Sequence, residues 1–413
     1  MKTATLSIGD ELLFGEVIDT NAAVIAARLA DVGLPVRRHL TVGDDEGEIA
    51  AAIESLSADH DLIIATGGLG PTDDDVTAKA AAQAAGRRLV LHEEALHRLR
   101  EFFARRGRDM HPANERQCLL PAKAGIIPNP TGTASGFHLL HQEALILFLP
   151  GVPAEMTRML DESVLPLVLR RWRDRPVVRT AVLSVFGLSE AEIGSRLTGL
   201  DAGQVGFTIA YCVDYPVVQV KLRARGGDAV VVAAILERNV PLVRERLGDH
   251  IVAEGGDSLD GVVARLFRER GVTFALAESC TGGLIAKRIT DQPGSSAYFL
   301  QGFVTYANTA KEQFLGVPAE LLADVGAVSA EAAKAMARGA LRSVGSDLAL
   351  AVTGIAGPDG GTPEKPVGTV FIALADRTGC TVKGYRFTGD RDKIRTITAV
   401  TALDWLRRRL LAY

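Results

Sequence analysis

Residues 61–77 read Asp-Leu-Ile-Ile-Ala-Thr-Gly-Gly-Leu-Gly-Pro-Thr-Asp-Asp-Asp-Val-Thr, and this stretch decides the fold of the first part of the chain. Its short apolar run is typical of a buried strand. The glycines and the proline that follow favour a tight loop. An alanine-rich segment over 76–85 then predicts a helix, with Gly86 as its stop. A strand, a loop and a helix in this order indicate a parallel sheet that is covered by helices.

The same alternation extends on both sides of this stretch and covers the first 170 residues. It returns from residue 259, where a helix over 259–270 precedes a strand over 272–277. In sheets of this kind, ligands bind at the carboxyl ends of the strands. Further elements are expected at these positions: strands over 3–8 and 34–42, and helices over 21–33 and 46–56.

The segment between these two regions has a different pattern. Residues 217–223 alternate strictly between apolar and polar, which indicates a half-buried strand. We also expect strands over 177–186 and 204–211, and helices over 189–197 and 228–247. The segment has no dense cluster of Ser, His or Cys, so we interpret it as a packing module that does no chemistry.

Breaks near 173–176 and 255–258 separate the three parts. We therefore predict an α/β protein, in which two strand–helix alternating domains with mostly parallel sheets occupy residues 1–172 and 257–413. A small α+β module over residues 173–256 joins them. Each part is long enough to bury a core of its own.

Composition excludes several classes of protein. The chain has 413 residues, 46 Lys and Arg against 50 Asp and Glu, and a net charge of −4, so it lacks the basic surface of a general nucleic-acid binder. No apolar stretch reaches the roughly 18 residues of a membrane span. The start of the chain lacks the features of a signal peptide. The four cysteines are far apart, so we expect neither a zinc knuckle nor a disulfide framework, and we expect a reducing cytoplasm.

Four polar loops follow predicted strands in the first domain and form one candidate site; they cover residues 9–13 with 19–21, 67–77, 128–134 and 149–156. Their glycines allow backbone N–H groups to approach a bound anion. Carboxylates beside a phosphate would repel it, and a bridging divalent cation with oxygen ligands resolves that conflict. The alternative is ordinary N-caps and turn residues. The candidate metal ligands are Asp10, Asp74 and Asp75, and the candidate substrate-binding residues are Gly67, Gly68, Gly70, Thr72, Asn129 and Thr133.

A second candidate site lies at Ser279, between a predicted strand and a helix. A serine hydroxyl needs a base to become a nucleophile, but no histidine occurs in residues 251–413. The base must then be a lysine, a tyrosine or a carboxylate. Lys311 and Tyr306 lie five residues apart at the end of another predicted strand. Their ordinary alternatives are a surface lysine and a packed strand residue.

Glycine-rich and basic residues complete this second site. The loop that begins at Gly354 and includes Gly357 fits a backbone cradle for a phosphate or a ribose. Arg391 heads the last helix, where it could clamp a phosphate or face solvent. The helix N–H groups near Thr281 and Gly282 are candidates for holding an oxyanion.

Residues 1–170 resemble the molybdopterin-cofactor biosynthesis fold. The resemblance rests on a strand that is followed by Gly-Gly-x-Gly-Pro, an Asp, and a Thr that leads into a helix. With Gly-Asp-Glu-Leu-Leu and Asp-Thr-Asn, they resemble the N-terminal domain of the CinA (competence/damage-inducible) family. The resemblance implies hydrolysis of the diphosphate of ADP-ribose with a divalent metal (Mg²⁺, Mn²⁺ or Co²⁺). The family's functional acidic residue falls on Asp75, and the match of Asp44 is looser.

The motifs Glu-Ser-Cys-Thr-Gly-Gly, Val-Thr-Tyr, Thr-Gly-Ile-Ala-Gly-Pro and Gly-Asp-Arg resemble the C-terminal domain of the same family. That resemblance implies hydrolysis of nicotinamide mononucleotide to nicotinic acid mononucleotide and ammonia, with no cofactor. The nucleophile falls on Ser279, the assisting residues on Tyr306 and Lys311, and substrate contacts on Thr353 and Arg391. We also expect a homodimer.

Two alternatives stay open. The N-terminal domain could bind molybdopterin instead of hydrolysing a diphosphate. The protein could also be a non-enzymatic adaptor in DNA uptake or the response to DNA damage, although its balanced charge speaks against this.

Overall fold

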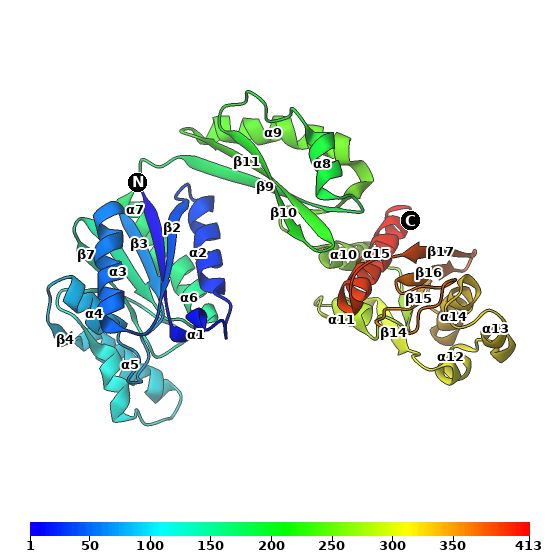
Figure 1. Ribbon diagram of the computed structural model, residues 1–413, viewed down its shortest axis with the longest axis horizontal. Helices are drawn as coiled ribbons and strands as arrows, with labels where there is room; N and C mark the ends of the chain where they lie inside the picture. Colours follow the sequence, from blue (N-terminus) through cyan, green and yellow to red (C-terminus); the bar gives the residue numbers. More distant parts are fainter. The chain divides into compact units, whose positions relative to one another are not determined.

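The computed structural model describes residues 1–413 (Figure 1), and the chain divides into two compact units. The first unit comprises Met1–Arg179 with Ala224–Ala233, and the second comprises Thr180–Arg223 with Ala234–Tyr413. The predicted α/β class is confirmed, because strands and helices alternate in both units. None of the helices combines the length and the apolar character needed to cross a bilayer.

The first unit is built on a six-stranded sheet in the order β2-β1-β3-β8-β7-β6. The neighbours β2-β1-β3-β8 pair in parallel, and β7 and β6 add to the sheet antiparallel. The strands are β1 (Thr3–Ile8), β2 (Val36–Val42), β3 (Leu62–Thr66), β6 (Gly125–Ile127), β7 (Gly136–His141) and β8 (Ala144–Leu149). A separate pair consists of β4 (Leu89–Leu91) and β5 (Leu119–Pro121).

Helices cover both faces of this sheet (Figure 1), because successive side chains of a strand point to opposite faces. In β3, Ile63 and Ala65 pack with α3, α4 and α5, whereas Leu62 and Ile64 pack with α2, α6 and α7. The helices are α1 (Asp10–Leu13), α2 (Thr20–Asp31), α3 (Glu46–Asp59), α4 (Thr77–Ala84), α5 (Glu93–Arg105), α6 (Pro153–Met159) and α7 (Leu165–Arg171). A short 3-10 helix, η1 (Pro112–Cys118), and a π-helical turn, η2 (Leu160–Val164), complete this part.

The middle module has a four-stranded sheet in the order β10-β11-β9-β12. Its strands are β9 (Val177–Phe186), β10 (Phe207–Asp214), β11 (Val217–Gly226) and β12 (Ile251–Glu254), and its helices are α8 (Glu190–Leu197) and α9 (Ala229–Leu247), with a 3-10 turn, η3 (Gly248–His250). The strict alternation of 217–223 is that of β11, where Val218, Val220 and Leu222 are buried. The strand predicted over 204–211 lies three residues later, because Gln204 belongs to the preceding turn.

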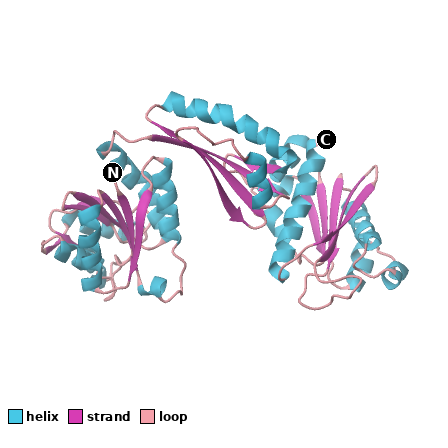
Figure 2. Ribbon diagram, turned by 45° about the horizontal axis from the view of Figure 1, so that its top comes forward, coloured by secondary structure: helices cyan, strands magenta, loops and turns pink.

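The C-terminal domain has a five-stranded sheet in the order β14-β13-β15-β16-β17. β14, β13 and β15 are parallel, and β16 and β17 are antiparallel. Figure 2 shows helices on both sides of this sheet. The strands are β13 (Phe274–Glu278), β14 (Phe299–Val304), β15 (Leu348–Gly354), β16 (Thr369–Asp376) and β17 (Cys380–Arg386).

Two separate apolar clusters fill this domain, one on each face of the sheet. α10, α11 and α15 cover one face, and α12 and α14 cover the other. The helices are α10 (Leu259–Arg270), α11 (Leu284–Thr290), α12 (Asn308–Leu315), α13 (Ala319–Asp324), α14 (Ala330–Val344) and α15 (Arg391–Leu411), with a 3-10 turn, η4 (Ser295–Ala297).

Two glycines inside helices should respond in opposite directions to the same substitution. Gly339 in α14 is buried, and a methyl group there would overlap the carbonyl oxygen of Leu315. Gly194 in α8 has open space at the same position. We expect Gly339→Ala to lower the free energy of unfolding by about 1–3 kcal/mol through overpacking, and Gly194→Ala to raise it by about 1 kcal/mol through helix propensity. Chemical denaturation of the two variants measures both changes, and a stabilised Gly339→Ala protein would contradict the close packing of α14 on α12.

Candidate functional site

The glycine loop after β3 is folded back on itself by one carboxylate. Asp75 Oδ1 accepts a hydrogen bond from the N–H of Gly70 at 2.6 Å, and its Oδ2 accepts one from the N–H of Thr72 at 2.9 Å. Gly67 and Gly68 have φ values of 108° and 62°, a conformation that L side chains rarely adopt. The pattern Gly-Gly-x-Gly-Pro-Thr with a later Asp therefore encodes a specific loop shape.

This loop borders a cavity of about 430 Å³ at the carboxyl ends of β1, β3 and β8. The structure brings six of the predicted residues to its wall. Thr72, Asn129 and Asp10 are not part of this wall, and Asn129 donates instead to Ala134 O at 2.9 Å and Glu155 Oε2 at 2.7 Å. The predicted residues on the wall are Gly67, Gly68, Gly70, Asp74, Asp75 and Thr133.

Several carboxylates give this cavity a negative potential. Asp10 and Asp44 are linked reciprocally, because each carboxylate accepts the other's backbone N–H, at 3.0 and 3.1 Å. Burial raises the pKa of Asp44, and the charges of Asp10, Asp74 and Asp75 raise it further against the hydrogen bond from the backbone of Asp10. Asp44 is therefore part of this cluster and lines the cavity, although its match to the family pattern is looser.

The structure does not assemble Asp10, Asp74 and Asp75 as three ligands of one ion. No group of three or more His, Cys, Asp or Glu side chains in the chain is arranged to hold a metal. Asp75 does not act as a ligand here because both of its carboxylate oxygens already accept hydrogen bonds from the glycine loop. The oxygen donors around the cavity still suit a hard cation that is held by one or two carboxylates together with a substrate phosphate, as is usual for Mg²⁺.

Two residues of this cavity were not singled out from the sequence. Gln117 in η1 is 7% exposed, and its Oε1 is buried without a hydrogen-bond partner. Glu155 in the first turn of α6 also lines the cavity. Gln117 carries no sequence signal, because it lies 40 residues beyond the glycine loop in an irregular segment. Glu155 belongs to one of the four polar loops, and its position directly after β8 was the available signal.

In the C-terminal domain, Ser279 lies directly after β13 at the carboxyl edge of the sheet. Its N–H donates to Val352 O of β15 at 3.0 Å, and its side chain is 9% exposed. This contact extends the pairing of β13 with β15 by one residue. The backbone of Ser279 is therefore fixed by the sheet, while its hydroxyl stands at the start of the turn that leads into α11.

Lys311 is buried beside this serine and is not a surface lysine. It is 1% exposed, and its Nζ lies 3.3 Å from Ser279 Oγ. The same nitrogen donates to the carbonyl oxygens of Thr305 at 2.8 Å and Tyr306 at 3.1 Å. No carboxylate is within ion-pair distance. Burial lowers the pKa of Lys311 from its ordinary value of 10.5, because an unpaired charge loses its hydration there.

Tyr306 contributes to this contact through its backbone. The Tyr306 ring is 63% exposed, and its hydroxyl accepts a hydrogen bond from Arg391 Nη2 at 3.3 Å. Arg391 Nη1 also donates to Gly357 O at 2.8 Å. The structure thus brings Tyr306, Gly357 and Arg391 together. The hydroxyl of Tyr306 is hydrogen-bonded to Arg391, whereas its backbone carbonyl is hydrogen-bonded to Lys311. Tyr306 was expected to assist Ser279, but its hydroxyl is hydrogen-bonded to Arg391 and not to Ser279 or Lys311.

Two other predicted residues, Thr353 and Gly354, are enclosed at the end of β15. Thr353 in β15 is 1% exposed, and its hydroxyl donates to Ala327 O at 2.7 Å. Gly354, the last residue of β15, packs so closely on β16 that a side chain there would meet the backbone of Thr369. Both residues shape the strand end rather than present a polar group.

Cys280, the neighbour of Ser279, is an inert thiol. It is 6% exposed and belongs to the apolar cluster beneath α11 and α15. Burial raises the pKa of Cys280 to about 12. Because the thiolate is the reactive form of cysteine, this environment disfavours Cys280 as a nucleophile.

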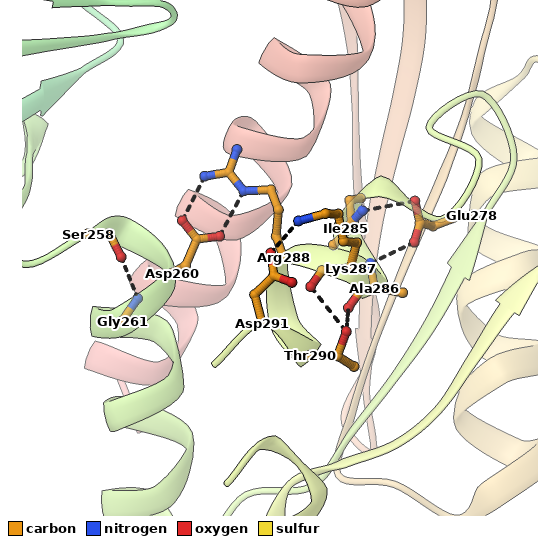
Figure 3. Close-up of polar contacts among 10 residues, drawn as sticks. All are labelled: Ser258, Asp260, Gly261, Glu278, Ile285, Ala286, Lys287, Arg288, Thr290 and Asp291. Carbon is orange, nitrogen blue, oxygen red and sulfur yellow. Dashed lines mark hydrogen bonds and ion pairs between the residues drawn. The ribbon is translucent and has the colours of Figure 1, made fainter. Parts of the chain in front are cut away.

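Glu278, the last residue of β13, fixes the turn that carries Ser279 (Figure 3). It is 1% exposed, and its carboxylate accepts the N–H groups of Gly283, Ile285 and Ala286 at 3.1, 3.1 and 2.9 Å. A buried carboxylate thus neutralises the positive end of α11. In the same figure, Arg288 ties α11 to Asp260 of α10 through two contacts of 2.7 Å.

This arrangement limits the groups that can hold an oxyanion. The expected donor Gly282 is engaged, since its N–H donates to Ser279 O at 3.1 Å. Thr281 and Thr305 are 0% and 1% exposed, and their hydroxyls are buried without a hydrogen-bond partner. In the sequence, Thr281 lies two residues after Ser279, and Thr305 lies six residues before Lys311. Arg395 of α15 holds the turn from the other side by donating to Thr281 O at 2.8 Å.

Replacing the Glu278 carboxylate should destabilise the domain. Both carboxylate oxygens of Glu278 accept backbone N–H groups. In Glu278→Gln, the amide NH₂ would face one of these N–H groups and leave it without an acceptor, so we expect the free energy of unfolding to fall by about 1–3 kcal/mol. Chemical denaturation measures this loss. The matched control is Glu331→Gln, an exposed glutamate in the first turn of α14, and an equal effect of both variants would contradict a special role of Glu278.

Three family models match consecutive parts of the chain. Residues 4–170 match a probable molybdopterin binding domain, residues 180–253 match the damage-inducible protein CinA KH domain, and residues 256–410 match the CinA C-terminal domain. Among solved structures, a CinA superfamily protein from Klebsiella pneumoniae is 37% identical, covers 38% of this chain and 97% of its own, and has a TM-score of 0.37. The competence/damage inducible protein CihA from Agrobacterium tumefaciens is 45% identical over 37% of this chain and 94% of its own, with a TM-score of 0.36.

Whole-length relatives show the family. A CinA-like protein from Geobacter sulfurreducens is 72% identical over 411 residues, which is 100% of both chains. A CinA-like protein from Geobacter metallireducens is 70% identical over 413 residues, again 100% of both chains. The chain therefore belongs to the CinA family.

Proposed function

We propose that the C-terminal domain hydrolyses the carboxamide of nicotinamide mononucleotide to nicotinic acid mononucleotide and ammonia, with Ser279 as nucleophile and Lys311 as base. The observation that carries this proposal is the 3.3 Å approach of Lys311 Nζ to Ser279 Oγ in a buried position where no carboxylate pairs with the amine. Serine paired with lysine is a known solution to the activation of a hydroxyl.

The hydrogen-bond partners of Lys311 fit a neutral amine. A neutral amine has two N–H groups and one lone pair, and the carbonyl oxygens of Thr305 and Tyr306 accept the two N–H groups at 2.8 and 3.1 Å. The lone pair then remains for the hydroxyl proton of Ser279. The lowered pKa of Lys311 favours this form.

The reaction follows from these positions. Ser279 Oγ attacks the carboxamide carbon while Lys311 takes its proton, which gives a tetrahedral intermediate. Lys311 returns the proton to the nitrogen, the C–N bond breaks, and ammonia leaves an acyl-serine. A water molecule, deprotonated by Lys311, then attacks the acyl carbon and releases the carboxylic acid and the serine hydroxyl. These steps need no cofactor.

The substrate class rests on the family resemblance and on Arg391. This guanidinium makes none of the ion pairs of the domain, so its charge is free to attract a phosphate. The exposed ring of Tyr306 lies beside it and offers an apolar face to a pyridine ring. Tyr306 follows β14, the strand that pairs with β13 before Ser279, and Arg391 is the first residue of α15.

Substitutions should separate the nucleophile from its neighbour. We expect Ser279→Ala and Lys311→Ala each to lower the deamidation of nicotinamide mononucleotide by about 10³-fold or more, because an unactivated hydroxyl attacks an amide too slowly. Cys280→Ala should keep most of the activity, because its buried thiol is protonated. Ammonia release by the purified variants measures this, with circular dichroism as the control for folding.

The pH profile gives this prediction a second readout. The neutral amine is the base, so kcat/KM should be lost as pH falls through the pKa of Lys311, and the midpoint should lie below 10.5. An active Ser279→Ala protein, or a folded Cys280→Ala protein without activity, would overturn the assignment.

We also propose that the N-terminal domain hydrolyses the diphosphate of ADP-ribose to AMP and ribose 5-phosphate. The glycine loop and its cavity support a phosphate site. The carboxylates Asp44 and Asp74 line this cavity and would hold a divalent cation together with the substrate, and the cation would supply charge neutralisation for the phosphates. Molybdopterin binding is the second candidate here, because the family model that matches residues 4–170 is a probable molybdopterin binding domain.

Removal of metal should separate the two activities. We expect EDTA to abolish cleavage of ADP-ribose and to leave deamidation nearly unchanged, because the carboxylate cluster belongs to the N-terminal cavity. Asp74→Asn should weaken only the cleavage of ADP-ribose, since Asp74 lines the cavity. Release of AMP and of ammonia from one preparation measures both reactions.

The adjacent Asp73 is the matched control. It is 90% exposed, pairs with Arg116 and does not line the cavity, so Asp73→Asn should leave both reactions intact. Equal losses of both activities in EDTA would contradict the assignment of the metal to one domain. Calorimetric binding of molybdopterin without any cleavage of ADP-ribose would favour the second candidate.

A further inference from the structure

A cavity of about 840 Å³ lies within the second unit, between the middle module and the C-terminal domain. None of the residues proposed for amide hydrolysis lines it. The side chains of Arg407 and Arg408 hold the two parts together by donating to Asp249 O, at 2.8 and 3.3 Å. Its volume is in the range of small-molecule sites, and such sites occur preferentially where two folded parts meet.

Aromatic side chains form much of the wall of this cavity. On the C-terminal side, the rings of Tyr385 and Phe387 stack at 5.2 Å and 12°, and Trp405 packs edge-on to Tyr385 at 6.4 Å. Trp405 Nε1 donates to the hydroxyl of Tyr385 at 2.8 Å, so the polar atoms of both rings are satisfied by each other. Phe186 and Tyr215 line the cavity from the middle module. Fixed aromatic walls of this kind suit a planar ring.

The charged side chains on the cavity wall differ in whether they are paired. The carboxylate of Asp404 is already paired with Arg407 at 2.8 Å and Arg408 at 2.7 Å. Glu190 lies in the first turn of α8, where the helix end favours its charge. Lys383 forms no ion pair, and its Nζ lies 5.2 Å from the centre of the Tyr385 ring. Because residues two apart in a strand share a face, β17 presents this uncompensated cation beside the aromatic wall.

We propose that this cavity binds a planar aromatic molecule that carries one negative charge. The ring lies against the aromatic wall, and the anionic group pairs with the Lys383 ammonium. This proposal does not depend on the serine–lysine reaction, because the two sites share no residue.

Trp405 allows a direct test, because the chain has 2 tryptophans. In full-length Trp172→Phe protein, Trp405 is the single fluorescent tryptophan, and the probes are 8-anilinonaphthalene-1-sulfonate and its uncharged counterpart N-phenyl-1-naphthylamine. We expect saturable energy transfer from Trp405 to one bound sulfonate per chain. Lys383→Ala should weaken binding of the sulfonate about fivefold through the loss of one charge pair and leave binding of the uncharged probe unchanged.

Two further variants make the result specific. Lys287→Ala removes an exposed lysine outside the cavity and should change neither affinity. Ile397→Phe places a larger side chain on the wall that α15 contributes and should weaken both probes, with circular dichroism to confirm folding. The absence of saturable transfer from Trp405, or a Lys383→Ala protein that binds both probes as before or loses both equally, would overturn the proposal.

Discussion

Lys311 is buried at 1% exposure with carbonyl oxygens as partners and with no carboxylate to balance a charge. A protonated lysine in this position would lose its hydration without an ion pair, so the folded state favours the neutral amine. In the proposed reaction this amine is the base, so the serine next to it needs no histidine. Burial of Lys311 requires a rigid backbone around it, because the amine must keep its hydrogen bonds to the carbonyl oxygens of Thr305 and Tyr306.

The sheet supplies that rigidity. Ser279 directly follows β13, Thr305 directly follows β14, and the Ser279 N–H donates to the neighbouring β15. Parallel pairing brings these strand ends to one edge. Glu278 adds a second constraint, because its buried carboxylate orders the turn between Ser279 and α11. The position of Ser279 therefore follows from backbone geometry, and the lowered pKa of Lys311 follows from burial.

The sequence was most informative where local pattern and chemistry coincide. The glycine loop and the strand before it could be predicted, because each depends on near neighbours in the chain, whereas Asp75 was expected as a metal ligand and instead holds the loop through Gly70 and Thr72. The absence of histidine left a lysine, a tyrosine or a carboxylate as possible bases, and only the resemblance to the CinA family paired Ser279 with Lys311. Gln117 could not, since its place in the cavity depends on the path of an irregular segment. Tyr306 contacts Lys311 through its backbone carbonyl and not through the expected hydroxyl, because spacing in the sequence does not determine which of its oxygens faces Lys311.

The two candidate sites meet opposite electrostatic requirements. At the N-terminal cavity, carboxylates stand close enough for the charges of Asp10, Asp74 and Asp75 to raise the pKa of Asp44, so a cation is needed before a phosphate can approach. At Ser279 the requirement is the reverse, because a carboxylate beside Lys311 would hold the proton on the amine, whereas burial lowers the pKa of Lys311. Placing the two sites on separate sheets lets each one keep the local field that its own chemistry requires.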